Sequence, residues 1–269
     1  MMNKAVILAA GAGTRMQQKD ATAIETDKQK AIAATGIKAL IPIDRPFLDY
    51  VLSNLADAGF QQICLVIASG PNRIRDYYEQ LDCERLSIQF AVQAEALGTA
   101  NAVLAAESFA RSDPFLVINS DNYYPLAALR SLREAAGSAT VGFVRKRLID
   151  GSNIPPERIR AFSVIDSGGD GTLKRILEKP EQTFVDQLPE PVLVSMNCWR
   201  FSSAIFAACR DLPLSSRGEY ELPDAVMCSI TQFGEQYRVI RCVEPVLDLS
   251  SRRDVESVAS RLRGVEVQL

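Results

Sequence analysis

Short apolar runs alternate with stretches of helical periodicity along the first half of this chain. The runs are rich in β-branched residues and apolar on both faces, as buried strands are; they cover residues 5–10, 63–68, 88–93 and 115–118. Between them, apolar side chains recur at helical spacing over residues 48–58, 74–81 and 100–109. This alternation predicts an α/β fold with a mainly parallel sheet covered by helices on both faces.

The second half of the chain changes character. Its expected strands cover residues 140–145, 161–165, 173–177, 192–201 and 237–243, and its expected helices cover residues 203–210, 222–233 and about 252–262. The turn-rich residues 167–171 join two of these strands, which favours a hairpin and therefore a mixed sheet. Because no repeat or low-complexity linker interrupts the sequence, we expect residues 1–269 to form one domain.

Composition excludes several classes of chemistry. The net charge of −3 gives no reason to expect nucleic acid or an anionic membrane as a partner. The chain has no histidine, which excludes Ser-His-Asp and Cys-His catalysis and argues against a zinc site. The six cysteines form no CxxC pair, and the first apolar run is too short for a signal sequence or a membrane span. We therefore expect free thiols and a cytoplasmic location.

The first apolar run leads directly into Gly11-Ala12-Gly13-Thr14-Arg15. Glycines at a strand-to-helix turn let backbone amides approach an anion, and Arg15 adds a fixed positive charge for phosphate oxygens. A simple tight turn is the other interpretation of so short a pattern. Two common phosphate-binding motifs fit poorly: Met16 replaces the third small residue of the dinucleotide fingerprint, and the Lys-Ser/Thr of a Walker loop is absent.

A polar segment, residues 17–36, separates this glycine loop from the next apolar run. Loops of this length are usually either disordered or functional lids, and the sequence leaves both interpretations open.

The stretch Leu8-Ala9-Ala10-Gly11-Ala12-Gly13-Thr14-Arg15-Met16 resembles the opening motif of the sugar nucleotidyltransferases. The following Lys38-Ala39-Leu40-Ile41-Pro42-Ile43-Asp44-Arg45-Pro46-Phe47-Leu48 is similar to that family's next conserved stretch, although Ile37 stands where the family usually has proline. The resemblance implies a Rossmann-like mixed sheet, with a nucleotide-binding half over about residues 1–135 and a sugar-binding half over about residues 136–269. It implies catalytic roles for Arg15 and Lys38, and nucleotide contacts from Leu8, Ala10, Gly11, Ala12, Gly13 and Thr14.

Two further motifs carry the resemblance. The sequence from Gln93 to Ala100 resembles the family's base-reading segment, in its form most similar to that of UTP-using members, and it implies nucleotide contacts from Gln93, Gly98 and Thr99. Asp121 follows a buried strand, where ligands bind in open α/β sheets. In the family this aspartate holds Mg²⁺; without the resemblance it could equally be a cap or turn residue.

Motifs in the second half complete the set. Glu178-Lys179-Pro180 resembles the element in which a glutamate contacts sugar hydroxyls and a lysine contacts the sugar phosphate. The resemblance further implies sugar contacts from Asn122 and Asn197, a catalytic role for Lys179, and a second magnesium ligand at Asp248, where Ser250 replaces the usual glycine of the turn. Trp199 is expected in the core, and Asp224 is expected to cap a helix or line the site.

The implied activity is transfer of a nucleoside monophosphate from an NTP, with UTP or dTTP favoured, to a sugar 1-phosphate. Mg²⁺ is the implied cofactor, and the NTP and the sugar 1-phosphate are the implied partners. Two alternatives remain open from the sequence: a nucleotidyltransferase that acts on a non-sugar phosphorylated acceptor, and a non-catalytic nucleotide sensor on the same fold.

Overall fold

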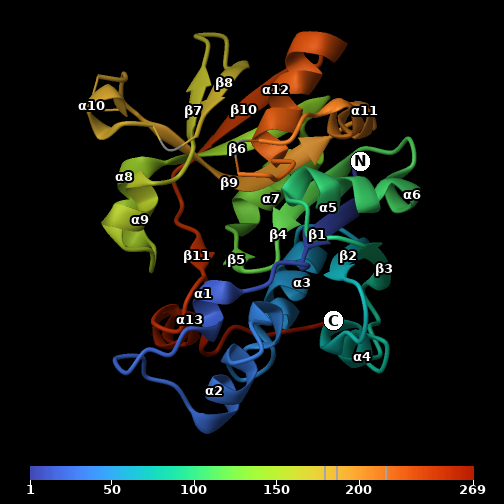
Figure 1. The fold of residues 1–269 in the computed structure, drawn as a ribbon, viewed down its shortest axis with the longest axis vertical. Coiled ribbons are helices and arrows are strands. Elements are labelled where there is room, and N and C mark those ends of the chain that lie inside the picture. Colours follow the sequence, from blue (N-terminus) through green and yellow to red (C-terminus); the bar gives the residue numbers. More distant parts are fainter. Residues whose placement is uncertain (179, 186, 216) are drawn as a thin grey trace.

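A mixed, mainly parallel sheet organises the molecule in the computed structural model, which describes residues 1–178, 180–185, 187–215 and 217–269. Its main strands run in the order β10-β6-β9-β4-β1-β2-β3 (Figure 1). They are β1 (Lys4–Leu8), β2 (Gln62–Ala68), β3 (Ser87–Gln93), β4 (Phe115–Asn119), β6 (Ser138–Val144), β9 (Leu193–Phe201) and β10 (Tyr237–Cys242). Strand β9 runs antiparallel to β4 and β6, whereas the other pairs among these strands are parallel. The predicted fold class is confirmed.

Strand β1 shows why both faces of the sheet are covered. Ala5 and Ile7 belong to one apolar cluster, and Val6 and Leu8 belong to another, because successive side chains point to opposite faces. The second cluster is covered by α5 (Thr99–Ala105), α11 (Ala204–Asp211) and α12 (Leu222–Phe233). Trp199 is fully buried in this layer, as predicted.

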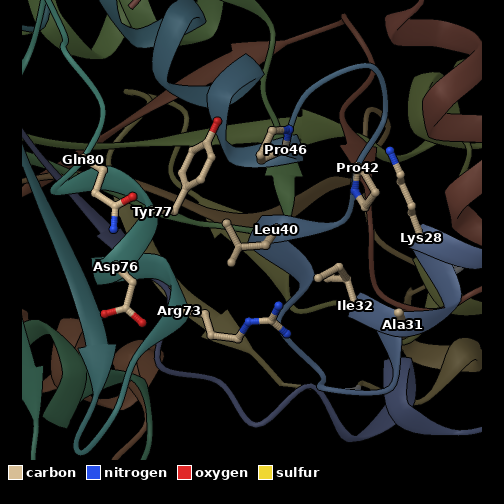
Figure 2. A pocket seen from close by; sticks show the side chains of 10 residues that line it. All are labelled: Lys28, Ala31, Ile32, Leu40, Pro42, Pro46, Arg73, Asp76, Tyr77 and Gln80. Carbon is tan, nitrogen blue, oxygen red and sulfur yellow. The ribbon is translucent and has the colours of Figure 1, made fainter.

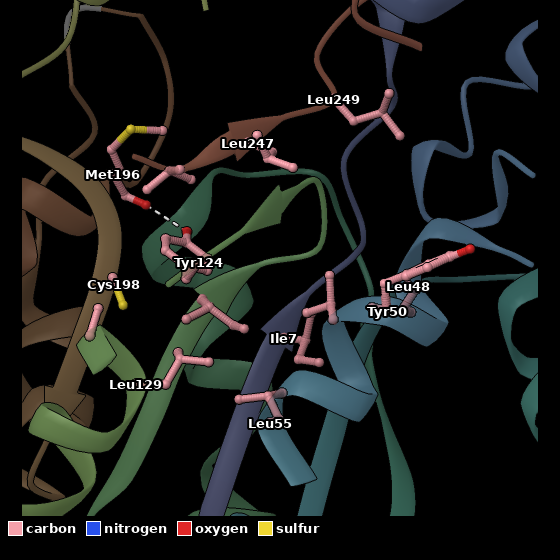
Figure 3. Close-up of a cluster of buried hydrophobic side chains, with 14 of the residues drawn as sticks. Ile7, Leu48, Tyr50, Leu55, Tyr124, Leu129, Met196, Cys198, Leu247 and Leu249 are labelled. Carbon is pink, nitrogen blue, oxygen red and sulfur yellow. Dashed lines mark hydrogen bonds between the residues drawn. The ribbon is translucent and has the colours of Figure 1, made fainter. Parts of the chain in front are cut away.

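The opposite face carries the larger cluster, part of which is drawn in Figure 3. It packs under α3 (Phe47–Asp57), α7 (Leu126–Glu134) and α13 (Asp254–Leu262). Tyr124 lies inside this layer and donates a hydrogen bond from its hydroxyl to the carbonyl of Met196 at 2.6 Å. This bond ties the segment after β4 to the middle of β9, next to the candidate site.

Smaller elements extend the sheet at one end. The hairpin of β7 (Val164–Ser167) and β8 (Leu173–Leu177) pairs with β9 through β7 and projects at the top of Figure 1. The short helices α8 (Arg145–Gly151), α9 (Pro156–Arg160) and α10 (Gln182–Val185) are drawn at the left of the same view. A separate two-stranded sheet joins β5 (Asn122–Tyr123) to β11 (Leu247–Asp248). It brings the segment after β4 beside a segment far along the chain.

The polar segment 17–36 is not an irregular loop throughout. After α1 (Thr14–Gln17) it forms α2 (Asp27–Ala33), and a 3-10 turn η1 (Lys38–Leu40) follows. Thr26 and Gln29 make a reciprocal capping box at the start of α2, and Gln29 Nε2 donates to the carbonyl of Pro42 at 2.8 Å. Local capping therefore supplies the order that apolar periodicity did not predict.

The bounds of several other helices and strands differ from those predicted. The helix expected at residues 100–109 is two helices, α5 and α6 (Glu107–Ala110), and the helix expected at 74–81 ends earlier, as α4 (Arg73–Tyr78). The strand expected at 161–165 begins only at Val164 because Ala161 is still the C-cap of α9. Among the described residues, no helix is both long and apolar enough to cross a membrane.

Candidate active site

A cleft of about 590 Å³ opens at the edge of the sheet where β1, β2, β3 and β4 end. The carboxyl ends of parallel strands meet at one edge, and open α/β sheets bind their ligands there. Side chains and backbone from these strand ends, from η1 and from β9 line the cleft. Of the predicted site residues, it brings together Leu8, Ala10, Gly11, Ala12, Gly13, Lys38, Gln93, Gly98, Thr99, Asp121 and Asn197.

The glycine loop forms one wall of the cleft and has a conformation that requires glycine. Gly13 is the N-cap of α1 with φ of 60°, and a Cβ atom on it would lie 2.0 Å from the carbonyl oxygen of Gly36. A side chain at this position would therefore push the loop away from the segment that precedes Lys38. The loop backbone is left open to the cleft, as close approach of an anion demands.

Lys38 and Asp121 form the charged centre of the cleft. Lys38 Nζ lies 2.7 Å from Asp121 Oδ2, and both side chains are about one-fifth exposed, at 20% and 21%. The turn η1 carries Lys38 to this position, and the end of β4 carries Asp121. In this partly desolvated place the pair is less screened than a surface pair, and its ammonium group can offset phosphate charge while its carboxylate can ligate a cation.

Gln93, at the end of β3, has its amide orientation fixed by its neighbours. Its Nε2 donates to the carbonyl of Gly98 at 2.9 Å and to Asn101 Oδ1 at 2.9 Å. Because a backbone carbonyl can only accept, Nε2 must face Gly98, and Oε1 is left as the acceptor for a ligand. Gly98 has φ of 104°, and a Cβ on it would lie 2.5 Å from the carbonyl oxygen of Tyr220, so this loop needs glycine to approach residues 219–220.

Asn197 enters the cleft from the middle of β9 through a distorted backbone. Its φ is 52°, in the left-handed region that non-glycine residues rarely adopt, although asparagine tolerates it best. The pairing of β6 with β9 also shifts register beside it, between Thr140 and Gly142. An irregularity at this point turns a side chain of the sheet towards the ligand site, as bulges commonly do.

Asp248 lies behind the cleft rather than in it. Only 6% of the residue is exposed, and its Oδ2 accepts a hydrogen bond from Asn122 Nδ2 at 3.0 Å. Its Oδ1 lies 3.1 Å from a guanidinium nitrogen of Arg158 and has no aligned hydrogen bond within the described part of the chain. Burial, followed by the charge of Asp121, raises the pKa of Asp248, and Arg158 acts in the opposite direction.

The two aspartates nevertheless fit a hard divalent ion. The pairing of β11 with β5 puts Asp248 opposite Asn122, and the amide of Leu249 donates to the carbonyl of Asp121 at 2.8 Å, so the carboxylates sit on adjacent segments. Mg²⁺ commonly takes one or two carboxylates and fills its other positions with water and substrate phosphates. The buried Oδ1 of Asp248 has no aligned donor among the residues that the structure describes, and it is an acceptor of the kind such an ion uses.

Several predicted residues lie elsewhere. Thr14 and Arg15 are exposed on α1, outside the lining of the cleft. Asn122 is buried, and its side chain contacts Asn119, Tyr124 and Asp248 instead of the open cleft. Glu178 is exposed and accepts a hydrogen bond from Ser163 Oγ at 2.5 Å. Lys179 lies outside the described residues. Asp224 sits in the first turn of α12 and does not line the cleft.

The cleft also contains residues that the sequence did not single out. The loop after β2 contributes Ser69, Pro71 and Asn72, and Glu219 approaches from the segment before α12. Asn72 caps α4 through its side chain, so Pro-Asn after a strand is a signal that could have marked this wall. Glu219 lies just before a helix start, but nothing in the sequence assigned it a role, because its place depends on the hydrogen bonds between Tyr220 and the loop that contains Gly98.

A second cavity of about 560 Å³ lies between α2 and α4 (Figure 2). Its walls are mostly apolar, including Ile32, Leu40 and Tyr77, and Lys28 and Arg73 stand at its sides. It contains no residue of the phosphate loop and neither member of the Lys38–Asp121 pair. The cleft at the strand ends is therefore the candidate active site.

Known proteins resemble this chain along its length. It is 26% identical over 268 residues to the UTP–glucose-1-phosphate uridylyltransferase AglF of Haloferax volcanii, covering 98% of each chain. It is 26% identical over 226 residues to the low-salt glycan biosynthesis nucleotidyltransferase Agl11 of the same organism, covering 83% of this chain. The chain spans only 56% of Agl11 and 46% of the bifunctional protein GlmU of Methanococcus vannielii.

Solved structures share the fold at low identity. A UDP-glucose pyrophosphorylase complexed with UDP-glucose superposes with a TM-score of 0.74 at 18% identity, over 97% of this chain and 98% of the other. The UTP-bound enzyme from Acinetobacter baumannii superposes with a TM-score of 0.71 at 20% identity, over 99% and 96%. The family model for nucleotidyl transferases matches residues 4–244, and the chain therefore belongs to the nucleotidyl transferase family.

Proposed function

We propose that this protein transfers a nucleoside monophosphate from an NTP to a sugar 1-phosphate and releases pyrophosphate. UTP is the favoured nucleotide and dTTP the next. The observation that carries the proposal is the convergence of the phosphate loop, the Lys38–Asp121 pair, Gln93 and Asn197 in one cleft. Both AglF and the A. baumannii structure bear names that include UTP, which supports the choice of base.

The reaction joins two polyanions that repel each other, so charge neutralisation and alignment are its main requirements. A phosphate oxygen of the sugar 1-phosphate attacks the α-phosphorus, and the bond from the α-phosphorus to pyrophosphate breaks. The attacking phosphate is already ionised at neutral pH, so no general base is needed, which suits a chain without histidine. Positioning alone can contribute about 7–11 kcal/mol to such a step.

We assign roles by position. The backbone of residues 11–13 binds the β- and γ-phosphates, and Lys38 offsets charge near the α-phosphate. Asp121 and Asp248 would hold Mg²⁺, which supplies positive charge to the phosphates that are joined. Gln93 and Gly98 contact the base, and Asn197 contacts the sugar.

The remaining assignments rest on the family resemblance. Arg15 binds departing pyrophosphate, Lys179 holds the sugar phosphate, and Asn122 and Glu178 contact the sugar. Residues up to about 135 form the nucleotide half and the later residues form the sugar half of one domain. Free thiols at all six cysteines support a reducing, cytoplasmic setting.

A pyrophosphate-release assay over a matrix of substrates tests the proposal. UTP, dTTP, CTP, ATP and GTP are each paired with glucose 1-phosphate, galactose 1-phosphate, N-acetylglucosamine 1-phosphate and phosphocholine. We expect turnover with a sugar 1-phosphate and UTP or dTTP, and its loss on Asp121→Asn. Turnover with phosphocholine alone would establish the non-sugar alternative, and nucleotide binding by calorimetry without any turnover would establish the sensor.

A further inference from the structure

Arg158 holds the second candidate metal ligand, although no motif marks it. It lies in α9, which is far in sequence from both aspartates. One guanidinium nitrogen, Nη2, lies 3.1 Å from Asp248 Oδ1, while Asn122 holds Oδ2 of the same carboxylate. Both oxygens of Asp248 are thus engaged, and the residue does not line the cleft. In this arrangement an incoming ion meets the Arg158 guanidinium beside Oδ1 and the Asn122 amide at Oδ2.

The anchor of Arg158 is a different carboxylate, Asp254 at the start of α13. Nη1 and Nη2 donate to the two oxygens of Asp254 at 3.0 and 3.1 Å, which is the two-pronged geometry that holds arginine most firmly. Asp254 is itself fixed by the backbone amides of Ser250 and Ser251, at 3.1 and 2.7 Å. Arg158 therefore keeps a charge partner whether or not it contacts Asp248.

Of the two carboxylates that Arg158 contacts, Asp248 is bound with the poorer hydrogen-bond geometry. It is an ion pair without an aligned hydrogen bond, since Asp248 Oδ1 has no bonded donor among the described residues. Arg158 Nε is also buried and finds no acceptor in the described ranges, so the guanidinium is not fully hydrogen-bonded where it stands. A small movement of Arg158 can release Asp248 without breaking the fork to Asp254.

Because both are positively charged, Arg158 and a divalent ion compete for contact with Asp248. Within the part of the chain that the structure describes, the carboxylates of Asp121, Asp248 and Asp254 form ion pairs with Lys38 and Arg158 and with no other cation. A divalent ion placed on Asp248 while Arg158 remains there would meet a like charge at close range in a poorly solvated site. The phosphates of a nucleotide supply the negative charge that lets the ion stay and Arg158 withdraw.

This inference rests on the proposed function. We propose that Arg158 is a positioning residue that contacts Asp248 in the free enzyme and moves away, so that Mg²⁺ can bind there, only when a nucleotide binds. Before the nucleotide arrives, the ion then has only Asp121, which already pairs with Lys38, and is held weakly. The second carboxylate joins only after the nucleotide has bound, so the ion is held tightly only in the complex with the NTP.

Mn²⁺ binding to the full chain without nucleotide, followed by electron paramagnetic resonance, tests this directly. Arg158→Gln frees Asp248, and we expect the Kd for Mn²⁺ to fall by about tenfold, the order expected when one partly screened like charge is removed. Arg160→Gln, on the same helix but exposed, is the matched control and leaves the Kd unchanged. Adding Asp248→Asn to Arg158→Gln returns the Kd to the wild-type value. An unchanged or higher Kd in Arg158→Gln overturns the proposal, because it means that Arg158 does not exclude the ion.

A second measurement keeps the test valid if Arg158→Gln does not fold. In the wild-type background, Asp248→Asn should leave Mn²⁺ binding to the free enzyme unchanged and weaken it about tenfold when a non-hydrolysable UTP analogue is present. Equal weakening in both conditions overturns the inference. Asp121→Asn separates this failure from that of the proposed function: if it leaves Mn²⁺ binding intact in both conditions, the metal assignment itself is wrong.

Discussion

At the scale of single residues, the pair of Lys38 and Asp121 determines what the cleft can do. The two side chains are in contact at 2.7 Å before any substrate is present, so each holds the other in place in the cleft that the phosphate loop also lines. Preorganised charge of this kind stabilises a transition state without reorganisation during the reaction. Most of the catalytic effect should therefore depend on these two groups.

Replacing Lys38 with methionine tests this claim. We expect Lys38→Met to lower kcat by about 10²–10³-fold, the range for removing one electrostatic stabiliser, while the KM for the NTP changes less. Steady-state pyrophosphate release measures both constants. Lys28→Met is the control, because Lys28 is exposed in α2 beside the other cavity. A kcat within twofold of wild type would remove Lys38 from the chemistry.

Substitution of Asn101 tests how the protein distinguishes one nucleobase from another. Its Oδ1 and the carbonyl of Gly98 together hold Gln93 Nε2, which leaves Oε1 to accept from the imide N–H of uracil. Asn101→Leu removes one of these acceptors, and we expect the preference in kcat/KM for UTP over CTP to fall by about tenfold. Asn101→Asp keeps an acceptor and should keep the preference. Equal loss in both variants would show that the residue acts through packing alone.

At the scale of elements, the segment before η1 is clamped to the C-terminal segment by charge. Glu25 and Arg252 pair at 3.0 Å with side chains only 2% and 8% exposed, and Asp20 pairs with Arg253 next to them. Asp254, which anchors Arg158, follows directly in the chain. The segment for which the sequence left both disorder and a lid open is thus joined to the residues that follow β11, the strand that carries Asp248.

Breaking the buried member of this clamp should loosen the segment. Glu25→Gln leaves the Arg252 charge buried without its partner, and such changes cost about 3–5 kcal/mol. We expect a lower melting temperature and faster proteolytic cleavage within residues 17–36. Asp27→Asn, which removes only an exposed pair with Lys30, is the control and should change stability by less than about 0.5 kcal/mol. Equal protease sensitivity of both variants would contradict the clamp.

The sequence predicted the elements whose apolar residues recur at a regular spacing. It missed the elements that depend on individual hydrogen bonds or on pairing with a distant segment. Strands such as β2 and β4 are apolar on both faces, so their pattern identifies them. Helix α2 has little apolar periodicity and depends on the Thr26–Gln29 capping box, while β5 and β11 are two residues long and exist only through each other. No local pattern could predict that pairing.

The site follows the same division. Gln93 and Asp121 were expected to share a site, and both line the cleft because parallel strands end at one edge of the sheet. Arg158 could not be predicted, since its role depends on α9 folding back beside β11. Asn122 belongs to a motif that predicted a sugar contact, yet its amide donates to Asp248 instead of facing the cleft. That difference is set by tertiary packing.

At the scale of the whole molecule, several cysteine thiols and tyrosine hydroxyls are buried in the two apolar layers that cover the sheet. Burial raises the pKa of Cys64 and of Cys209 from 9.0 to about 12, and it raises the pKa of Tyr124 well above its ordinary value. None of these groups serves the proposed reaction. They matter for stability, because the folded state retains protons that the unfolded chain gives up.

The sign of this effect gives a prediction for alkaline pH. A group whose pKa is raised on folding contributes its full stability below the unfolded value, here 9.0 for the thiols, and loses it as pH rises towards about 12. Each such thiol lowers the free energy of unfolding by about 1.4 kcal/mol per pH unit within that window.

Urea denaturation under reducing conditions should therefore show a free energy of unfolding that is flat from pH 7.5 to 8.5. It should decline between pH 9 and 10, before most lysines and tyrosines of the unfolded chain titrate. Cys209→Ala removes one titrating group, so its curve should start lower at pH 7.5 and decline less steeply. A decline as steep as that of the wild type would mean that the buried thiols do not govern alkaline unfolding.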